Sequence, residues 1–381
     1  MSAPAPIGLY VHWPYCARVC PYCDFNVVRA RGREAEAKAL GEALLIDLRT
    51  QAARIGPRTL ASIHFGGGTP SLMPPTLAAE IIDLAARLFA PAPDLEIGLE
   101  ANPLDRDRLS DQRQAGVERL SLGLQSLDAS SLQTLGRDHD PRQALEALDL
   151  ALKLFPRVSL DAIYGRPGQT AEDWRAELSA LADSGVGHLS AYQLTYEPGT
   201  AFGRAADRGR LVPSDDEAGA AFWQVTEEVL TGAGFEQYEV SNWARSPADR
   251  SRHNLLYWRG AEYLGVGPGA HGRVVVDGMR RATAGARRPA DFIRRVGESG
   301  TGLDEDEPLS PSEAAEERLI LGLRIEEGVR FDELTPLSLS PEAPRVARLE
   351  EEQLVRTDGG RLATTAKGRA LLDGVVRTLA A

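Results

Sequence analysis

Three cysteines are the residues of this chain whose type and spacing point most directly to chemistry. The 381-residue sequence has no others, and they stand at Cys16, Cys20 and Cys23 in a Cys-x3-Cys-x2-Cys pattern. Three thiolates can hold three irons of a cubane iron–sulfur cluster and leave the fourth iron without a protein ligand. A small chelating molecule can occupy that iron, so the spacing indicates a [4Fe-4S] cluster that takes part in chemistry.

Two other uses of the cysteines are open on the residues alone. Two of them could form a disulfide and leave one spare thiol. Alternatively, all three could bind zinc, which takes four protein ligands in structural sites, with His12 as the fourth. The cysteines do not form an even set, and Met1–Pro6 is too short and uncharged for a secretory signal. We therefore favour the cluster and expect reduced thiols in a cytoplasmic protein.

The triplet, with the aromatic Tyr22 directly before its last cysteine, resembles the radical S-adenosylmethionine (SAM) superfamily. The resemblance implies SAM as a second cofactor, whose amine and carboxylate bind the free iron. It also implies that the cluster passes an electron to the sulfonium of SAM, which releases methionine and a 5′-deoxyadenosyl radical.

Strand-then-helix units follow the cysteines, and this order favours a parallel sheet or barrel. Strands are expected at 7–12, 61–65, 95–100, 119–124, 158–161 and 188–194, and helices at 33–54 and 75–89. The cysteines, a run of glycines and several polar side chains all follow the ends of these strands. Because ligand sites of a parallel barrel lie at that rim, these groups should surround one cleft. The sequence thus predicts an α/β fold with a partial (β/α)6 barrel, open on one side.

Each strand-end signal also has a plainer interpretation. The glycines from Gly66 to Gly68 let backbone amides approach a ligand closely, because no Cβ stands in the way, but such a run is also typical of a simple turn. Glu100, Gln125 or Asp161 taken alone is more often a cap or loop residue. Their shared position at the rim favours a common ligand site.

Over essentially its whole length the sequence resembles one branch of the superfamily, the oxygen-independent coproporphyrinogen III oxidases and their relatives. Within this resemblance Arg137 can donate two parallel hydrogen bonds to a carboxylate, and Asp161 can accept hydrogen bonds from ribose hydroxyls. A surface ion pair with Asp138 or Asp140 is the plainer role for Arg137. The cofactor-binding residues implied by matching motifs are Tyr10, Tyr22, Gly67, Gly68, Thr69, Glu100, Gln125, Arg137, Asp161 and Ala270.

A His-Asn-x-x-Tyr-Trp run, formed by His253, Asn254, Tyr257 and Trp258, places a nitrogen ligand beside two large aromatic faces. This arrangement suits a porphyrin, although physics alone favours a loop histidine packed on core aromatics. In the resemblance the run belongs to relatives of the oxidase that bind heme and hand it to other proteins. The oxidases also have a fourth cysteine where Phe25 stands and a long N-terminal extension that this sequence does not contain.

The implied function is a heme chaperone that binds a cluster, SAM and heme, and transfers heme to acceptor haemoproteins such as respiratory enzyme subunits. An oxygen-independent coproporphyrinogen III oxidase, which would decarboxylate two propionates with the SAM-derived radical, is the alternative. Enzymatic turnover is therefore left open and no catalytic residue is assigned. A third hypothesis is a cluster-sensing regulator that uses a C-terminal winged helix on DNA.

Three regions are expected along the chain: a core barrel at 1–235, an extension with the His-Asn-x-x-Tyr-Trp run at 236–305, and a winged-helix-like α+β domain at 306–381. An edge strand is expected at 235–240 and an acidic linker at 300–311. In the last region we expect helices at 312–323, 342–352 and 366–379 and a hairpin at 354–364 with an Asp-Gly-Gly turn.

Charge and hydropathy narrow the set of partners. The net charge of −12 disfavours nucleic acid, which requires a basic face, so we interpret the acidic C-terminal region as a lid or docking domain. No run of about eighteen apolar residues is present, so no transmembrane segment is expected. Arginine pairs between Arg280 and Arg295 leave peripheral membrane contact open, but a solvated face is the preferred interpretation and we assign them no role.

Overall fold

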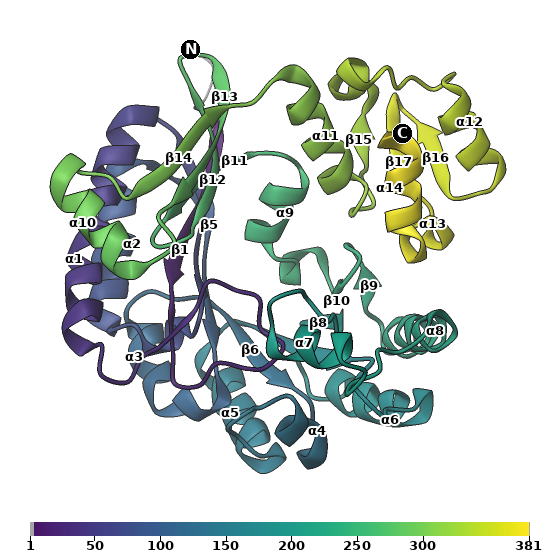
Figure 1. Ribbon diagram of the computed structural model, residues 1–381, viewed down its shortest axis with the longest axis horizontal. Helices are drawn as coiled ribbons and strands as arrows, with labels where there is room; N and C mark the ends of the chain where they lie inside the picture. Colours follow the sequence, from purple (N-terminus) through teal and green to yellow (C-terminus); the bar gives the residue numbers. More distant parts are fainter. Residues whose placement is uncertain (1–3, 381) are drawn as a thin grey trace.

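The computed structural model describes residues 4–380, and its centre is one 12-stranded sheet (Figure 1). Seven neighbouring strands run parallel, as the strand-then-helix order predicts. In spatial order they are β11 Glu262–Val266, β1 Pro6–Trp13, β4 Thr59–Gly67, β5 Ala90–Ala101, β6 Arg119–Gln125, β7 Arg157–Tyr164 and β8 His188–Gln193. The partial barrel is confirmed, and β11 adds a parallel strand that the sequence pattern did not reveal.

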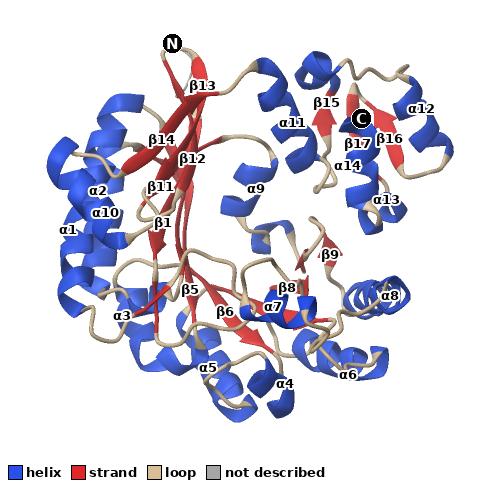
Figure 2. Cartoon of the chain, viewed as in Figure 1, coloured by secondary structure: helices blue, strands red, loops and turns tan. Residues whose placement is uncertain are grey.

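Helices between the parallel strands cover the outer face of the curved sheet (Figure 2). Both expected early helices are confirmed within a residue or two. The outer helices are α1 Glu34–Ile55, α2 Pro75–Leu88, α3 Leu109–Gln114, α4 Ala129–Thr134, α5 Pro141–Leu154, α6 Ala171–Ala182 and α8 Asp216–Gly232. α5 and α6 begin with capping boxes, in which Asp140 pairs with Gln143 and Thr170 with Asp173, so local sequence fixes where these helices start.

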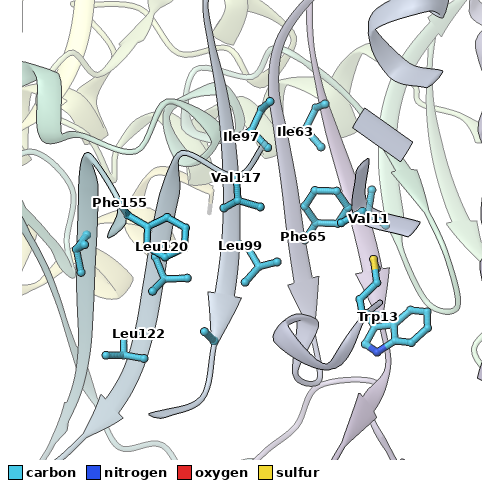
Figure 3. Close-up of a cluster of buried hydrophobic side chains, with 14 of the residues drawn as sticks. Val11, Trp13, Ile63, Phe65, Ile97, Leu99, Val117, Leu120, Leu122 and Phe155 are labelled. Atoms are coloured by element: carbon cyan, nitrogen blue, oxygen red, sulfur yellow. The ribbon is translucent and has the colours of Figure 1, made fainter. Parts of the chain in front are cut away.

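The main core lies between this sheet and its outer helices. Phe65, Leu99 and Leu120 come from three neighbouring strands and are fully buried, and Figure 3 shows them in one apolar cluster. β1 is buried at nearly every position from Ile7 to Trp13, as expected for a parallel strand that is covered on both faces. The parallel strands are therefore rigid supports that end at a common edge.

Antiparallel strands extend the parallel sheet at both sides. Beyond β11 lie β12 His271–Val276, β13 Met279–Gly285 and β14 Leu303–Pro308, and beyond β8 lie β10 Asn242–Ala244 and β9 Glu236–Gln237. The edge strand expected at 235–240 is confirmed over two residues. The linker expected at 300–311 is wrong, because residues 303–308 pair with β13. Charged side chains are common on an edge strand, because they prevent its unpaired backbone groups from pairing with another chain. The sequence of such a strand is therefore similar to that of an acidic linker.

The His-Asn-x-x-Tyr-Trp run forms a short helix, α9 Arg252–Trp258, which lies inside the curve of the sheet (Figure 1). The interpretation of His253 as a loop residue is therefore wrong. Ser251 caps the first turn of α9. The side chain of Glu96 accepts hydrogen bonds from the N–H groups of Arg252 at 3.1 Å and His253 at 3.0 Å. Glu96 precedes this turn by more than 150 residues, so no local pattern contains the contact.

Glu96 is fully buried on β5 and forms an ion pair with Arg157 at 2.9 Å. Burial opposes ionisation of Glu96, but Arg119, Arg157 and the two amides of α9 outweigh that cost and lower its pKa. The carboxylate therefore joins the sheet to the start of α9 and fixes the position of the His-Asn-x-x-Tyr-Trp run.

Two further helices belong to the extension and its surroundings, α7 Ala201–Asp207 and α10 Pro289–Ser299. Three of the six arginines in the pairs between Arg280 and Arg295 form ion pairs: Arg281 with Asp306, Arg294 with Glu298 and Arg295 with Asp304. No helix within residues 4–380 combines the length and apolar character needed to cross a membrane.

Residues 311–380 form an α+β unit with its own apolar core and a sheet of order β15-β17-β16. The expected hairpin is confirmed. Gly359 and Gly360 form its turn with φ of 55° and 74°, the left-handed conformation that a tight two-residue turn needs. The last expected helix is divided at Leu371. The elements are α11 Pro311–Gly322, β15 Val329–Arg330, α12 Pro344–Glu351, β16 Val355–Asp358, β17 Arg361–Thr364, α13 Ala366–Ala370 and α14 Leu372–Ala380.

Replacing Glu96 with alanine should destabilise the protein by about 3 kcal/mol, because it removes the carboxylate that pairs with the half-buried Arg157 and with two amides of α9. Urea unfolding of the purified chain measures the change. Glu298→Ala, which removes an exposed ion pair with Arg294, is the control and should change stability by less than about 1 kcal/mol. Equal stabilities for the two variants would contradict the role of Glu96.

Candidate cluster and cofactor site

The three cysteines lie on the loop that follows β1. Cys16 is buried, Cys20 and Cys23 are half-buried, and all three are free thiols. The short strand β2 Tyr15–Cys16 pairs with β3 Val28–Arg29, which folds the loop back on itself. Burial raises the pKa of the Cys16 thiol to about 11, and the two other thiols add to the rise against an opposing hydrogen bond with Thr69. Bound iron would relieve that cost, because metal ions favour the thiolate form.

The geometry around His12 and the cysteines bears on the uses of these cysteines that the sequence left open. His12 Nδ1 is hydrogen-bonded to the Tyr10 hydroxyl at 3.0 Å and His12 Nε2 to the Asn26 carbonyl at 2.8 Å, so neither nitrogen is free for zinc. Within residues 4–380 no three His, Cys, Asp or Glu side chains are grouped to hold a single metal ion. A cubane spreads its cysteine ligands over three irons, so three free thiols on one loop fit a cluster better than a mononuclear site.

The glycine loop after β4 packs directly against the cysteine loop. A Cβ at Gly67 would lie 2.8 Å from His12 Cε1, and a Cβ at Gly68 would lie 2.8 Å from the Cys16 sulfur. The amide of Gly68 donates to the Trp13 carbonyl at 2.8 Å and that of Thr69 to the Tyr15 carbonyl at 3.0 Å. These glycines therefore hold the cysteine loop in place, and the amides of Gly68 and Thr69 already have acceptors inside the protein.

A second glycine-rich loop flanks the cysteine loop on the side of β11. Ala270 is buried there, and a Cβ at Gly267 would lie 2.5 Å from the His12 carbonyl oxygen. Asn26 Nδ2 donates to the Pro268 carbonyl at 2.8 Å and so ties the end of the cysteine loop to this segment. The cysteine loop is thus held between backbone segments of both neighbouring strands.

Glu100 lies at the end of β5, as the sequence predicts, whereas Asp161 lies three residues before the end of β7, because that strand continues to Tyr164. Glu100 accepts from the Gly67 amide at 3.3 Å and pairs with His64 Nε2 at 3.1 Å. Asp161 accepts a hydrogen bond from the Ser121 hydroxyl at 3.0 Å. Burial raises the pKa of Asp161 to about 6, and the negative charge of Glu100 adds to the rise. The charge of Glu100 therefore contributes to the raised pKa of Asp161.

Gln125 and Arg137 also reach this edge of the sheet. Gln125 has φ of 67° at an irregularity in the β6–β7 pairing, and a non-glycine residue in this conformation often marks a functional site. Arg137 Nη2 donates to the Gly123 carbonyl at 3.0 Å, and Nη1 lies 3.6 Å from the Cys20 sulfur. Its buried Nε has no partner among the described residues. Arg137 is therefore a buried cation beside the cysteines, and the surface ion pair is not formed.

A cavity of about 510 Å³ opens beside the cysteine loop. It joins predicted cofactor residues to the His-Asn-x-x-Tyr-Trp run, because Tyr10, Gly67 and Glu100 line it together with Tyr257. Of the other predicted site residues, Gln125, Arg137 and Asp161 are not among its lining residues. The remaining lining residues are His12, Asp24, Phe25, Asn26, Tyr263, Gly269, His271, Ala284, Gly285, Arg287, Asp304 and Glu305.

The other residues of the His-Asn-x-x-Tyr-Trp run lie outside this cavity. His253 is 2% exposed, stacks on His64 with ring centroids 4.8 Å apart, and is hydrogen-bonded through Nδ1 to the Ser62 hydroxyl at 2.8 Å. Its Nε2 has no partner among the described residues. Trp258 packs toward the C-terminal unit, where the Arg324 guanidinium lies 4.7 Å from its ring centroid. Tyr22 instead packs on Phe202, with ring centroids 6.2 Å apart.

Sequence reasoning missed four residues of this site. His64 is paired with Glu100 and stacked on His253, Asn26 ties two loops together, and Tyr263 and His271 line the cavity. Two of them had a visible signal, since a histidine stands one residue before Phe65 in an expected strand and another follows Ala270 directly. Neither signal is specific by itself.

Comparison with known proteins places the chain in a family. The radical SAM superfamily matches residues 10–181, and the HemN C-terminal domain matches residues 309–371. Heme chaperone HemW of Escherichia coli K12 is 40% identical over 76% of this chain and 76% of its own length. The HemW of Mycobacterium tuberculosis H37Rv is 36% identical over 98% of this chain and 95% of its own. The chain belongs to the HemW family of radical SAM proteins.

The HemW family has eukaryotic relatives and a known fold. The bovine radical S-adenosyl methionine domain-containing protein 1, named as mitochondrial, is 40% identical over 99% of this chain and 89% of that protein. The solved structure of the E. coli coproporphyrinogen III oxidase HemN superposes with a TM-score of 0.81 over 99% of this chain and 90% of that chain, at 22% identity. This HemW-family chain therefore has the HemN fold, and its superfamily implies a [4Fe-4S] cluster and SAM.

Gly68→Ala should prevent cluster assembly while the fold is kept, because the new methyl group would lie 2.8 Å from the Cys16 sulfur and 2.7 Å from the Pro14 carbonyl oxygen. Iron and sulfide analysis after anaerobic reconstitution measures the loss, and circular dichroism checks the fold. Gly232→Ala is the matched control, since a Cβ there meets nothing within 4 Å. A Gly68→Ala protein with a full complement of iron would show that the close packing is not required.

Asp161→Asn should stabilise the protein without cofactors at pH 8, by about 1–3 kcal/mol, and by roughly half as much at pH 5, where part of the pH-dependent stability is already lost. The pKa of Asp161 is raised from 3.8 to about 6, so folding favours the protonated carboxyl. The stability that this provides is complete below pH 3.8 and is lost as the pH rises through about 6. Thermal melting at the two pH values measures the difference.

Asp107→Asn, whose side chain is 95% exposed, is the control and should show no such pH dependence. The same change in stability at pH 5 and pH 8 for Asp161→Asn would show that its carboxyl does not titrate in this range.

Proposed function

We propose that this protein is a heme chaperone that binds a [4Fe-4S] cluster, SAM and heme, and transfers heme to acceptor haemoproteins such as respiratory enzyme subunits. The observation that carries the proposal is the shared cavity, in which Tyr10, Gly67 and Glu100 from the predicted SAM side meet Tyr257 of α9. The family relatives named heme chaperone HemW support it.

The residues at the strand ends fit the two cofactors. Cys16, Cys20 and Cys23 would hold the cluster, which when bound supplies an electron to the sulfonium of SAM. Arg137 places a fixed positive charge beside Cys20, and a guanidinium group is a favourable partner for a carboxylate. Asp161 and Glu100 offer acceptors for hydroxyl and amine groups. Of the remaining predicted contacts, Gln125 ends β6, and Tyr22, Gly68, Thr69 and Ala270 lie on loops near the ends of the parallel strands.

On this proposal, aromatic side chains of α9 and β11 contact the heme ring. Tyr257 and Tyr263 lie with ring centroids 4.1 Å apart, and Phe25, 63% exposed, stands at the mouth of the cavity. Such faces suit a flat conjugated ring system. A reducing compartment such as the cytoplasm would keep the three thiols available for the cluster.

Hemin titrated into the anaerobically reconstituted protein should bind saturably, with a shifted Soret band, and pass to an apo-haemoprotein on mixing. Absorption spectroscopy follows both steps. In parallel, incubation with SAM, a reductant and coproporphyrinogen III should yield no protoporphyrinogen. Absence of a Soret change would reject the chaperone, and formation of protoporphyrinogen would favour the oxidase.

A further inference from the structure

The histidine of the His-Asn-x-x-Tyr-Trp run is poorly placed to meet a ligand in the cavity. His253 is 2% exposed, and burial lowers its pKa well below the usual value. Its ring is stacked on His64 and has its edge against Tyr257, with centroids 4.8 and 4.9 Å away. Tyr257 lines the cavity and His253 does not. For His253 to bind a metal in the cavity, Tyr257 and the buried start of α9 would have to move.

His271 has the access that His253 lacks. It is the first residue of β12, it is exposed, and its side chain lines the cavity. No hydrogen bond to its ring is formed by the residues that the structure describes, so both ring nitrogens are free to bind. Its backbone is fixed on both sides, since His271 pairs with Ala284 of β13 and follows the buried Ala270.

The surroundings of His271 suit a flat, metal-bearing ring with acidic side groups. Four Phe and Tyr side chains line the same cavity, Tyr10, Phe25, Tyr257 and Tyr263. Four acidic residues, Asp24, Glu100, Asp304 and Glu305, also line it and would favour a metal centre with net positive charge. Arg287 is exposed at the rim and offers a partner for carboxylates of the ligand.

We propose that His271 is the residue that ligates the iron of heme in this cavity, and that His253 is a positioning residue that holds Tyr257 in its wall. The inference rests on the proposed function and names its iron ligand. His253 performs the positioning through its contacts with Ser62, His64 and Tyr257. Histidine nitrogen is a common ligand of heme iron.

Hemin titration of the full chain tests the assignment, with wild type, His271→Ala and His253→Ala compared by Soret position and by electron paramagnetic resonance of the ferric iron. His271→Ala should bind hemin roughly tenfold more weakly and lose the nitrogen-ligated signal. Imidazole added to His271→Gly should restore that signal. His253→Ala should keep the signal, with at most a weaker affinity. Met279→Ala, exposed on the same hairpin, is the matched control.

The outcomes separate the two proposals. If the wild-type protein takes up no hemin, both the proposed function and this inference are overturned. If wild type binds hemin and His271→Ala has the same spectrum and affinity, only the role of His271 is overturned. Loss of the nitrogen-ligated signal in His253→Ala but not in His271→Ala assigns the iron to His253 instead. If His271→Ala does not fold, His271→Gln keeps a polar side chain of similar reach and the same comparison decides.

Discussion

Close backbone packing between the cysteine loop and its two neighbours is the constraint on which the rest of this site depends. β1 and β4 are parallel in a register that sets Trp13 against Gly67, so the cysteine and glycine loops leave the sheet together. A Cβ at Gly66, Gly67 or Gly68 would lie under 3 Å from Tyr10, His12 or Cys16. The missing side-chain volume is therefore what allows the glycine loop to pack against the start of the cysteine loop at Cys16.

The same packing explains why the strands of the extension continue the barrel sheet and do not form a separate unit. β11 lies next to β1, and the loop after it closes on His12 and Asn26 from the side opposite the glycine loop. β12, β13 and β14 then continue the sheet and supply a wall of the cavity. A ligand in this cavity would contact both the end of the cysteine loop and the strands of the extension. Its binding would therefore connect a structural change in one of these segments to the other.

The fold by itself does not decide the chemistry. This chain and the HemN oxidase share an architecture over nearly their whole lengths, yet a common scaffold can host different reactions. The side chains that face the cavity, such as Phe25 and Tyr257, are therefore the place where the chemistry of this chain would be decided. α9 keeps its place because a buried carboxylate, Glu96, satisfies its first amides and is itself neutralised by arginines of the sheet. A helix of seven residues would not hold this position without such support.

The sequence by itself determined the parallel strands, the cysteine triplet, the place of Glu100 at the end of β5, and the glycine turn of the C-terminal hairpin. Each of these is encoded locally, by spacing, by alternation of strand and helix, or by a turn that needs positive φ. Only the tertiary structure decided that 303–308 is an edge strand, that the His-Asn-x-x-Tyr-Trp run is helical, and that His271 faces the cavity while His253 is buried. These depend on partners that are distant in the chain, such as Glu96 for α9 and β13 for β14, and such contacts leave no pattern in the local sequence.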